Sequence, residues 1–267
     1  MRRAKLTDAR KAAGKSQGKV ADEVGVDRTT VGAWERGEAT PHDRQRGAYA
    51  EALCITLTEL HSILSYLPPP DKATPMWLSQ YLALEQSATE KNTHVSHVIN
   101  GLFQTPAYVA AVAESVGIGQ TPASYVQRMV EQRAWRQERV NNGSLRLIAI
   151  NSEMALRLKM GDNVIMADQL DHMVELGQLP NVTIQIVPFS VGQYEALRMA
   201  GHLFIMRHPW VEGVSVCFER YGSSNLIEDV DEAAHFLAAF DQAQDLALSP
   251  DDSLAFIGEI ADEWRHK

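Results

Sequence analysis

The chain has 267 residues, of which 45% are hydrophobic, and a formal net charge of −9 at pH 7. This length and composition suffice for two domains with a sizeable core. The sequence lacks a run of about 18 apolar residues, and its basic N-terminus lacks an apolar signal segment. We therefore expect a cytoplasmic protein with neither a membrane span nor a secretion signal.

The first predicted elements are two short helices joined by a sharp turn. Ser16 is a suitable N-cap for a helix over 17–24, and Gly25 supplies the positive φ that a turn out of this helix needs. Asp27 caps the next helix, and Gly37 ends it. Further helices are predicted over 6–13, 42–53 and 58–64. We therefore expect an all-α, five-helix N-terminal domain over residues 1–64.

The spacing of small, polar and aromatic residues in this segment is typical of a known family. The residues that carry the resemblance are Ser16-Gln17, Ala21, Gly25-Val26 and Trp34-Glu35-Arg36-Gly37. The segment resembles the Cro/repressor-like (Xre-type) helix-turn-helix family. That resemblance implies double-stranded DNA as a partner, with the second helix of the motif in the major groove.

Carried onto this sequence, the resemblance nominates two kinds of DNA contact. The candidates for base edges are Arg28, Thr29 and Thr30, with Ala33 one turn further on. The candidates for phosphates are Gln17, Lys19 and Arg36. Arg28 has the donors to bind guanine O6 and N7 together, which discriminates against a wrong base by roughly 1–3 kcal/mol.

Three further positions bear on the motif. The family often keeps a buried ion pair where this chain has Arg10 and Glu35, so we interpret this pair as structural. Gly18 and Gly32 lie inside predicted helices, where glycine costs roughly 0.5–1 kcal/mol relative to alanine. Gly32 is either tolerated or allows the helix backbone to approach DNA closely.

Charge and proline content divide the chain. Residues 1–46 hold eleven Lys and Arg against seven Asp and Glu, a balance of +4, and the rest of the chain has a balance of −13. Residues 65–75 contain four prolines, which favour an extended and fairly stiff spacer. We therefore predict a modestly basic DNA-binding domain, a linker over 65–75 and an acidic domain over 76–267.

The second domain is predicted to mix α and β structure, which makes the protein α+β overall. Threonine followed by proline at 105–106 and 121–122 marks two helix starts, the second helix running to about 140. Other predicted helices are 76–92, 152–159, 163–179, 231–243 and a last one to about 264. The predicted strands are 145–150, 182–187, 203–206 and 214–218.

The second half carries a resemblance of its own, in Ile99–Tyr108, Leu179–Phe189 and Gly201–Ile205. These runs are similar to the C-terminal domain of Xre-type, antitoxin-like regulators of actinomycetes. The resemblance implies transcriptional control, with a C-terminal domain that senses a ligand or binds a partner. It transfers no functional residue to this half of the chain.

We do not expect an enzyme. The sequence lacks a Gly-x-Ser-x-Gly elbow, a glycine-rich phosphate loop and a His-Glu-x-x-His motif, so no catalytic, cofactor or metal residue is nominated. His94 and His97 would share one face of a helix, but lack a further ligand at an informative spacing. The Arg- and Gln-rich run over 127–139 is either a solvated helix face or a site for an anion or acidic partner.

Two functional hypotheses follow. The first is a homodimeric transcriptional regulator on an inverted-repeat operator, whose acidic domain binds a small-molecule effector or a protein and thereby changes DNA affinity. The second is an antitoxin-like protein that neutralises a small protein partner and uses DNA binding for autoregulation.

Overall fold

The computed structural model describes residues 4–36, 39, 41–64, 76–115, 121–209, 214–220, 223–227 and 229–267. These residues form two compact units: one holds the helices between residues 4 and 87, and the other holds a sheet with the helices that cover it. The expected linker over 65–75 lies outside the described residues, so its structure and the domain limits drawn from it stay predictions.

The first unit confirms the five helices predicted for the N-terminal domain, to within two residues at each end. They are α1 (Ala4–Ala12), α2 (Gln17–Val24), α3 (Arg28–Arg36), α4 (Asp43–Ala52) and α5 (Leu57–Leu64), and α6 (Met76–Ser87) also belongs to this unit. A side-chain hydrogen bond sets the start of α2, and a left-handed glycine sets its end. The Ser16 hydroxyl accepts a hydrogen bond from the Lys19 amide, and Gly25 adopts φ 74° directly after α2.

An apolar core joins α1 to α5. Leu6, Val20, Val31 and Trp34 are buried in it, and the ring centroids of Trp34 and Tyr49 lie 4.8 Å apart. The apolar positions of α3 therefore point inward as predicted, which leaves its opposite side for solvent.

The predicted helix over 76–92 is only partly correct. The helix ends at Ser87, and β1 (Glu90–Val95) begins three residues later. In addition, α6 packs against α5 and groups with the first unit. An apolar stripe predicts that a helix buries one face, but it does not specify which neighbour covers that face.

The described part of the second unit contains a six-stranded sheet in the order β3-β2-β1-β4-β5-β6. The remaining strands are β2 (Arg146–Ser152), β3 (Val182–Val187), β4 (His202–Arg207), β5 (Val214–Arg220) and β6 (Ser223–Ile227). β1, β2 and β3 run parallel, whereas β4 pairs antiparallel with β1. The carboxyl ends of the parallel strands therefore share an edge of the sheet with the start of β4.

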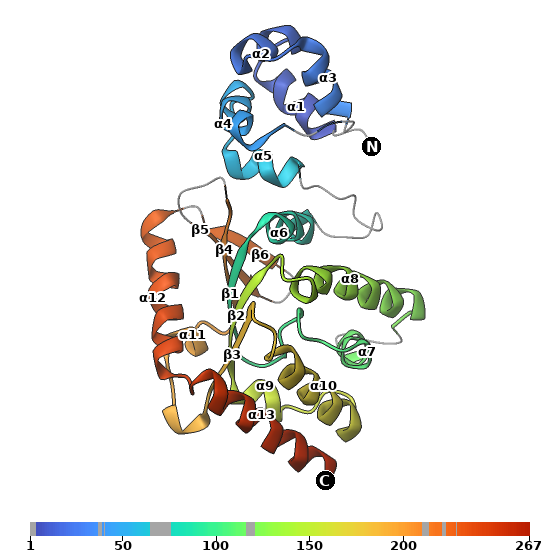
Figure 1. Cartoon of the computed structure of the whole chain (residues 1–267), viewed down its shortest axis with the longest axis vertical. Helices are drawn as coiled ribbons and strands as arrows, with labels where there is room; N and C mark the ends of the chain where they lie inside the picture. Colours follow the sequence, from blue (N-terminus) through green and yellow to red (C-terminus); the bar gives the residue numbers. More distant parts are fainter. Residues whose placement is uncertain are drawn as a thin grey trace. The chain divides into compact units, whose positions relative to one another are not determined.

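Helices cover both faces of this sheet (Figure 1). One face carries α11 (Glu195–Arg198) and α12 (Val230–Leu246). The other side holds α7 (Pro106–Ser115), α8 (Ala123–Asn141), α9 (Glu153–Arg157), α10 (Asn163–Leu176) and α13 (Pro250–Arg265). α13 packs along α10 and against β3. This arrangement confirms the mixed α+β class expected for the C-terminal half.

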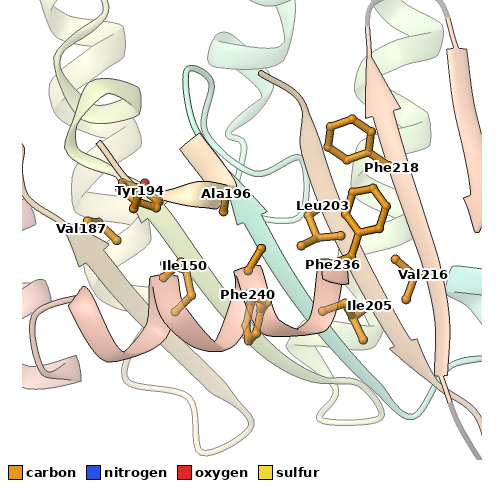
Figure 2. Packing of buried hydrophobic residues seen from close by; sticks show 12 residues of the cluster. Ile150, Val187, Tyr194, Ala196, Leu203, Ile205, Val216, Phe218, Phe236 and Phe240 are labelled. Carbon is orange, nitrogen blue, oxygen red and sulfur yellow. The ribbon is translucent and has the colours of Figure 1, made fainter. Parts of the chain in front are cut away.

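The layer between α12 and the sheet is apolar. Phe236 and Phe240 project from α12 toward the strands, where they meet side chains such as Ile150, Leu203 and Val216 (Figure 2). Phe240 is 2% exposed. This core fixes α12 on the sheet and leaves its polar side in water.

All four predicted strands are confirmed, but β1 and β6 were not predicted. β1 reads Glu-Lys-Asn-Thr-His-Val and β6 reads Ser-Ser-Asn-Leu-Ile, so both carry many polar residues. Neither shows the clear apolar pattern of a strand, and each depends on a neighbouring strand for its hydrogen bonds. No helix among the described residues is long and apolar enough to cross a membrane.

Candidate nucleic-acid interface

The outer side of the helix-turn-helix motif is formed by the start of α2 and by α3. Arg28 and Thr29 are exposed at the first turn of α3, Thr30 and Ala33 are half-buried, and Arg36 is exposed at its end. On α2, Lys19 is exposed and Gln17 is half-buried. All seven nominated residues therefore retain accessible surface on the two helices of the motif.

Asp27 organises the first turn of α3. Its carboxylate accepts hydrogen bonds from the Thr29 amide at 2.7 Å and from the Thr29 hydroxyl at 2.6 Å, which confirms the predicted cap. These two bonds, first that of the hydroxyl and then that of the amide, lower the pKa of Asp27. The same bonds hold the Thr29 side chain against Asp27, beside Arg28.

Glu35 connects α3 to α1 and α2. Its carboxylate accepts hydrogen bonds from Arg10 Nε at 2.5 Å, from Gln17 Nε2 at 2.8 Å and from Thr7 Oγ1 at 3.2 Å. Burial opposes ionisation of Glu35, but the bonds from Arg10 and Gln17 outweigh it and lower the pKa of the carboxyl. The predicted ion pair with Arg10 is thus present, and the network also includes Gln17, which sequence reasoning had nominated only for a phosphate.

In the second unit, the Arg- and Gln-rich helix α8 is not simply a solvated face, and its alternative role as a site for an anion or acidic partner stays a prediction. Arg133 Nε donates to Gln104 Oε1 at 3.3 Å, and Gln137 Nε2 donates to the Gln104 carbonyl at 2.7 Å. Arg136 is 4% exposed. Much of this polar face therefore holds the loop after β1, a role that the local sequence does not indicate.

The two histidines considered as a helical metal pair do not lie on a helix. His94 is the fifth residue of β1, and His97 follows that strand. His94 is fully buried, and its Nε2 lies 3.0 Å from the Tyr194 hydroxyl. Burial and, second, the proximity of His202 lower the pKa of His94 to about 4.

Buried polar groups lie on both faces of the sheet where the parallel strands end. The register puts His94 on the face that carries α12, and it puts Asn151 and His202 on the opposite face. Asn151 of β2 pairs in register with Val95 of β1, and His202 is the first residue of β4 and pairs with Glu219 of β5. Both amide atoms of Asn151, Nδ1 of His94 and Nε2 of His202 are buried without a hydrogen-bond partner among the described residues. Ligands of open α/β sheets bind outside the carboxyl ends of parallel strands, where the strand order changes direction. This edge is therefore the candidate ligand site of the second unit.

Comparison with protein families agrees with this geometry. A helix-turn-helix family model matches residues 6–60, so the protein is a DNA-binding regulator of the helix-turn-helix class. A second model, described as a domain of unknown function (DUF5753), matches residues 78–259, more than half of the chain. The chain belongs to this DUF5753 family. Neither a curated protein nor a solved structure matched the chain.

Proposed function

We propose that this protein is a sequence-specific transcriptional regulator that binds double-stranded DNA through the first turn of α3. The observation that carries the proposal is the fixed and outward position of this turn. The core residues Val31 and Trp34 and the Glu35 network anchor one side of α3, which leaves Arg28 and Thr29 exposed on the other. A recognition helix needs this combination of a rigid mount and accessible side chains.

The remaining nominated residues divide between the groove and the DNA backbone. Thr30 and Ala33 line the groove-facing side of α3 beside Arg28, and Gln17, Lys19 and Arg36 contact phosphates. Phosphate contacts fix the register of a protein on the duplex but carry no base information directly. This division predicts that loss of a phosphate contact weakens binding to all sequences alike.

The operator is an inverted repeat bound by a homodimer. One short helix reads too few bases to locate an operator alone, and a two-fold dimer places two such helices about 34–36 Å apart. The acidic C-terminal unit modulates DNA affinity by binding an effector, and the unpaired buried groups of Asn151 and His202 support this assignment. No observation on the described residues favours the antitoxin-like alternative.

Selection of the purified protein against random duplex DNA, with sequencing of the retained molecules, tests this function. We expect an enriched inverted repeat that is lost in Arg28→Ala, whereas the exposed α1 variant Lys11→Ala should select the same sequence. The thermal stability of Arg28→Ala should stay near that of the wild type, because Arg28 is exposed. Selection of an unchanged repeat by Arg28→Ala would overturn the groove assignment.

A further inference from the structure

Gly32 lies in the middle of α3, four residues before Arg36, so the two residues share one side of the helix. Glycine is a poor helix former, and its sequence context offers no turn or cap that would require it here. In the structure, another residue occupies the space where a side chain at position 32 would lie. A Cβ atom at position 32 would stand 2.9 Å from a terminal guanidinium nitrogen of Arg36 and 3.8 Å from its Cζ.

The guanidinium of Arg36 therefore occupies the space that a side chain at position 32 would take. A side-chain Cβ essentially never lies within 3.0 Å of an atom that packs against it, so any other residue at this position must displace the group. The displacement is small in energy, because the atom in question is the far end of a flexible side chain. Substitution of Gly32 should thus move Arg36 without unfolding the domain.

The same position borders the start of α2. The Nε2 atom of Gln17, the first residue of α2, would lie 3.8 Å from a Cβ at position 32. Gln17 is itself held by its hydrogen bond to Glu35. The Arg36 guanidinium and the Gln17 side chain therefore border the same space, the notch left by the missing Cβ of Gly32. Helix N-termini attract phosphate through their free amide groups and their dipole.

We propose that Gly32 is a positioning residue for DNA binding: its missing side chain seats the Arg36 guanidinium beside Gln17, where both contact one stretch of the DNA backbone. The proposal rests on the proposed function of the motif. In this proposal Gly32 is not merely tolerated in the helix, and it does not serve to bring the α3 backbone close to DNA. Gly32 acts on DNA only through Arg36.

Substitution of Gly32 should not lower the melting temperature, but it should lower the affinity for DNA. Gly32→Ala and Gly32→Leu introduce better helix formers, so the melting temperature should stay unchanged or rise by about 2–4 °C. The affinity for a duplex of random sequence should nevertheless fall, by up to about tenfold for the leucine, which fills the notch. The slope of log affinity against log salt should become shallower by about 1, as it should in Arg36→Ala.

A double-mutant cycle separates this mechanism from a direct clash with DNA. In the Arg36→Ala background, Gly32→Ala and Gly32→Leu should cause no further loss of affinity, because the group they displace is already gone. Gly47→Ala, in α4 with open space around its Cβ position, is the matched control and should leave both affinity and salt slope unchanged.

Each other outcome overturns a specific statement. A full additional loss in the Arg36→Ala background would show that position 32 meets DNA itself. Wild-type affinity in Gly32→Leu, or in Arg36→Ala, would show that the seated guanidinium does not bind the backbone. Failure of the wild-type protein to bind any duplex at about 50 mM salt would instead contradict the proposed function.

Discussion

Glu35 shows how one carboxylate sets the position of the recognition helix. The side chain is nearly buried and accepts bonds from residues of α1 and of the start of α2, so it ties three segments together at one point. A buried charge of this kind is tolerated because each oxygen is hydrogen-bonded. The orientation of α3 therefore depends on an electrostatic contact as well as on the apolar core.

We expect Glu35→Gln to destabilise the first unit by roughly 1–3 kcal/mol, because Arg10 then loses its charged partner. Chemical denaturation monitored by circular dichroism measures the effect. Glu23→Gln is the matched control: Glu23 pairs with Lys15 at 2.7 Å on the surface, where such a bridge contributes about 0–1 kcal/mol. Equal effects of the two substitutions would contradict the structural role of Glu35.

At the scale of elements, buried side-chain amides replace backbone hydrogen bonds between segments. Gln169 of α10 is fully buried; its Oε1 accepts from the Thr105 amide and its Nε2 donates to the Phe103 carbonyl, both at 2.7 Å. The side chain therefore satisfies two backbone groups next to the start of α7. Buried backbone groups without a partner are rare in folded proteins because they are costly.

Gln169→Leu should accordingly cost about 2–4 kcal/mol, since it leaves these two backbone groups unpaired. The free energy of unfolding in urea measures the loss. Gln178→Leu makes the same chemical change at an exposed position just after α10 and should stay within about 0.5 kcal/mol of the wild type. A loss that is similarly small for Gln169→Leu would mean that water replaces the amide in both bonds.

The attachment of α12 to the sheet rests on apolar burial rather than on hydrogen bonds. Phe240 lies in the core between helix and strands (Figure 2), so Phe240→Ala should destabilise the second unit by about 3–5 kcal/mol. Val230, at the start of the same helix, is 80% exposed, and Val230→Ala should change little. Urea denaturation of both variants checks the contrast, which fails if the two losses are similar.

At the scale of the whole molecule, acid acts on the two units through different residues. The pKa of Glu35 is lowered in the folded state, so its contribution is present above a pH of about 4.3 and is lost as the pH falls further. The pKa of His94 is lowered to about 4, so the unfolded chain binds a proton at pH 4–6.5 that the folded chain does not. The second unit should therefore weaken at a higher pH than the first.

The contribution of His94 to the pH dependence of stability can be measured with one substitution. Between pH 6.5 and pH 4 the wild-type second unit should lose roughly 3 kcal/mol of stability through this group, because each pKa unit corresponds to about 1.4 kcal/mol. His94→Phe keeps an aromatic ring beside Tyr194 but cannot titrate. Its stability, measured by denaturation at several pH values, should fall less over this range, and an unchanged slope would assign the acid sensitivity to other groups.

The sequence by itself determined the helix-turn-helix motif to within about a residue at each end. Ser16, Gly25 and Asp27 act on the backbone within three residues of their own positions, so their effects can be read locally. The same holds for the apolar strands β2, β3, β4 and β5, whose composition alone favours extended structure. The Arg10–Glu35 pair, 25 residues apart in the chain, came instead from the resemblance to the helix-turn-helix family.

Only the tertiary structure decided the features that depend on residues far apart in the chain. β1 is a strand because β2 and β4 supply hydrogen bonds on both of its sides, although its sequence is polar. Likewise, the polar face of α8 contacts the loop after β1, and Asn151 and His202 lie at the same edge of the sheet only through the strand order. These properties follow from long-range packing, which propensity and periodicity within one segment do not encode.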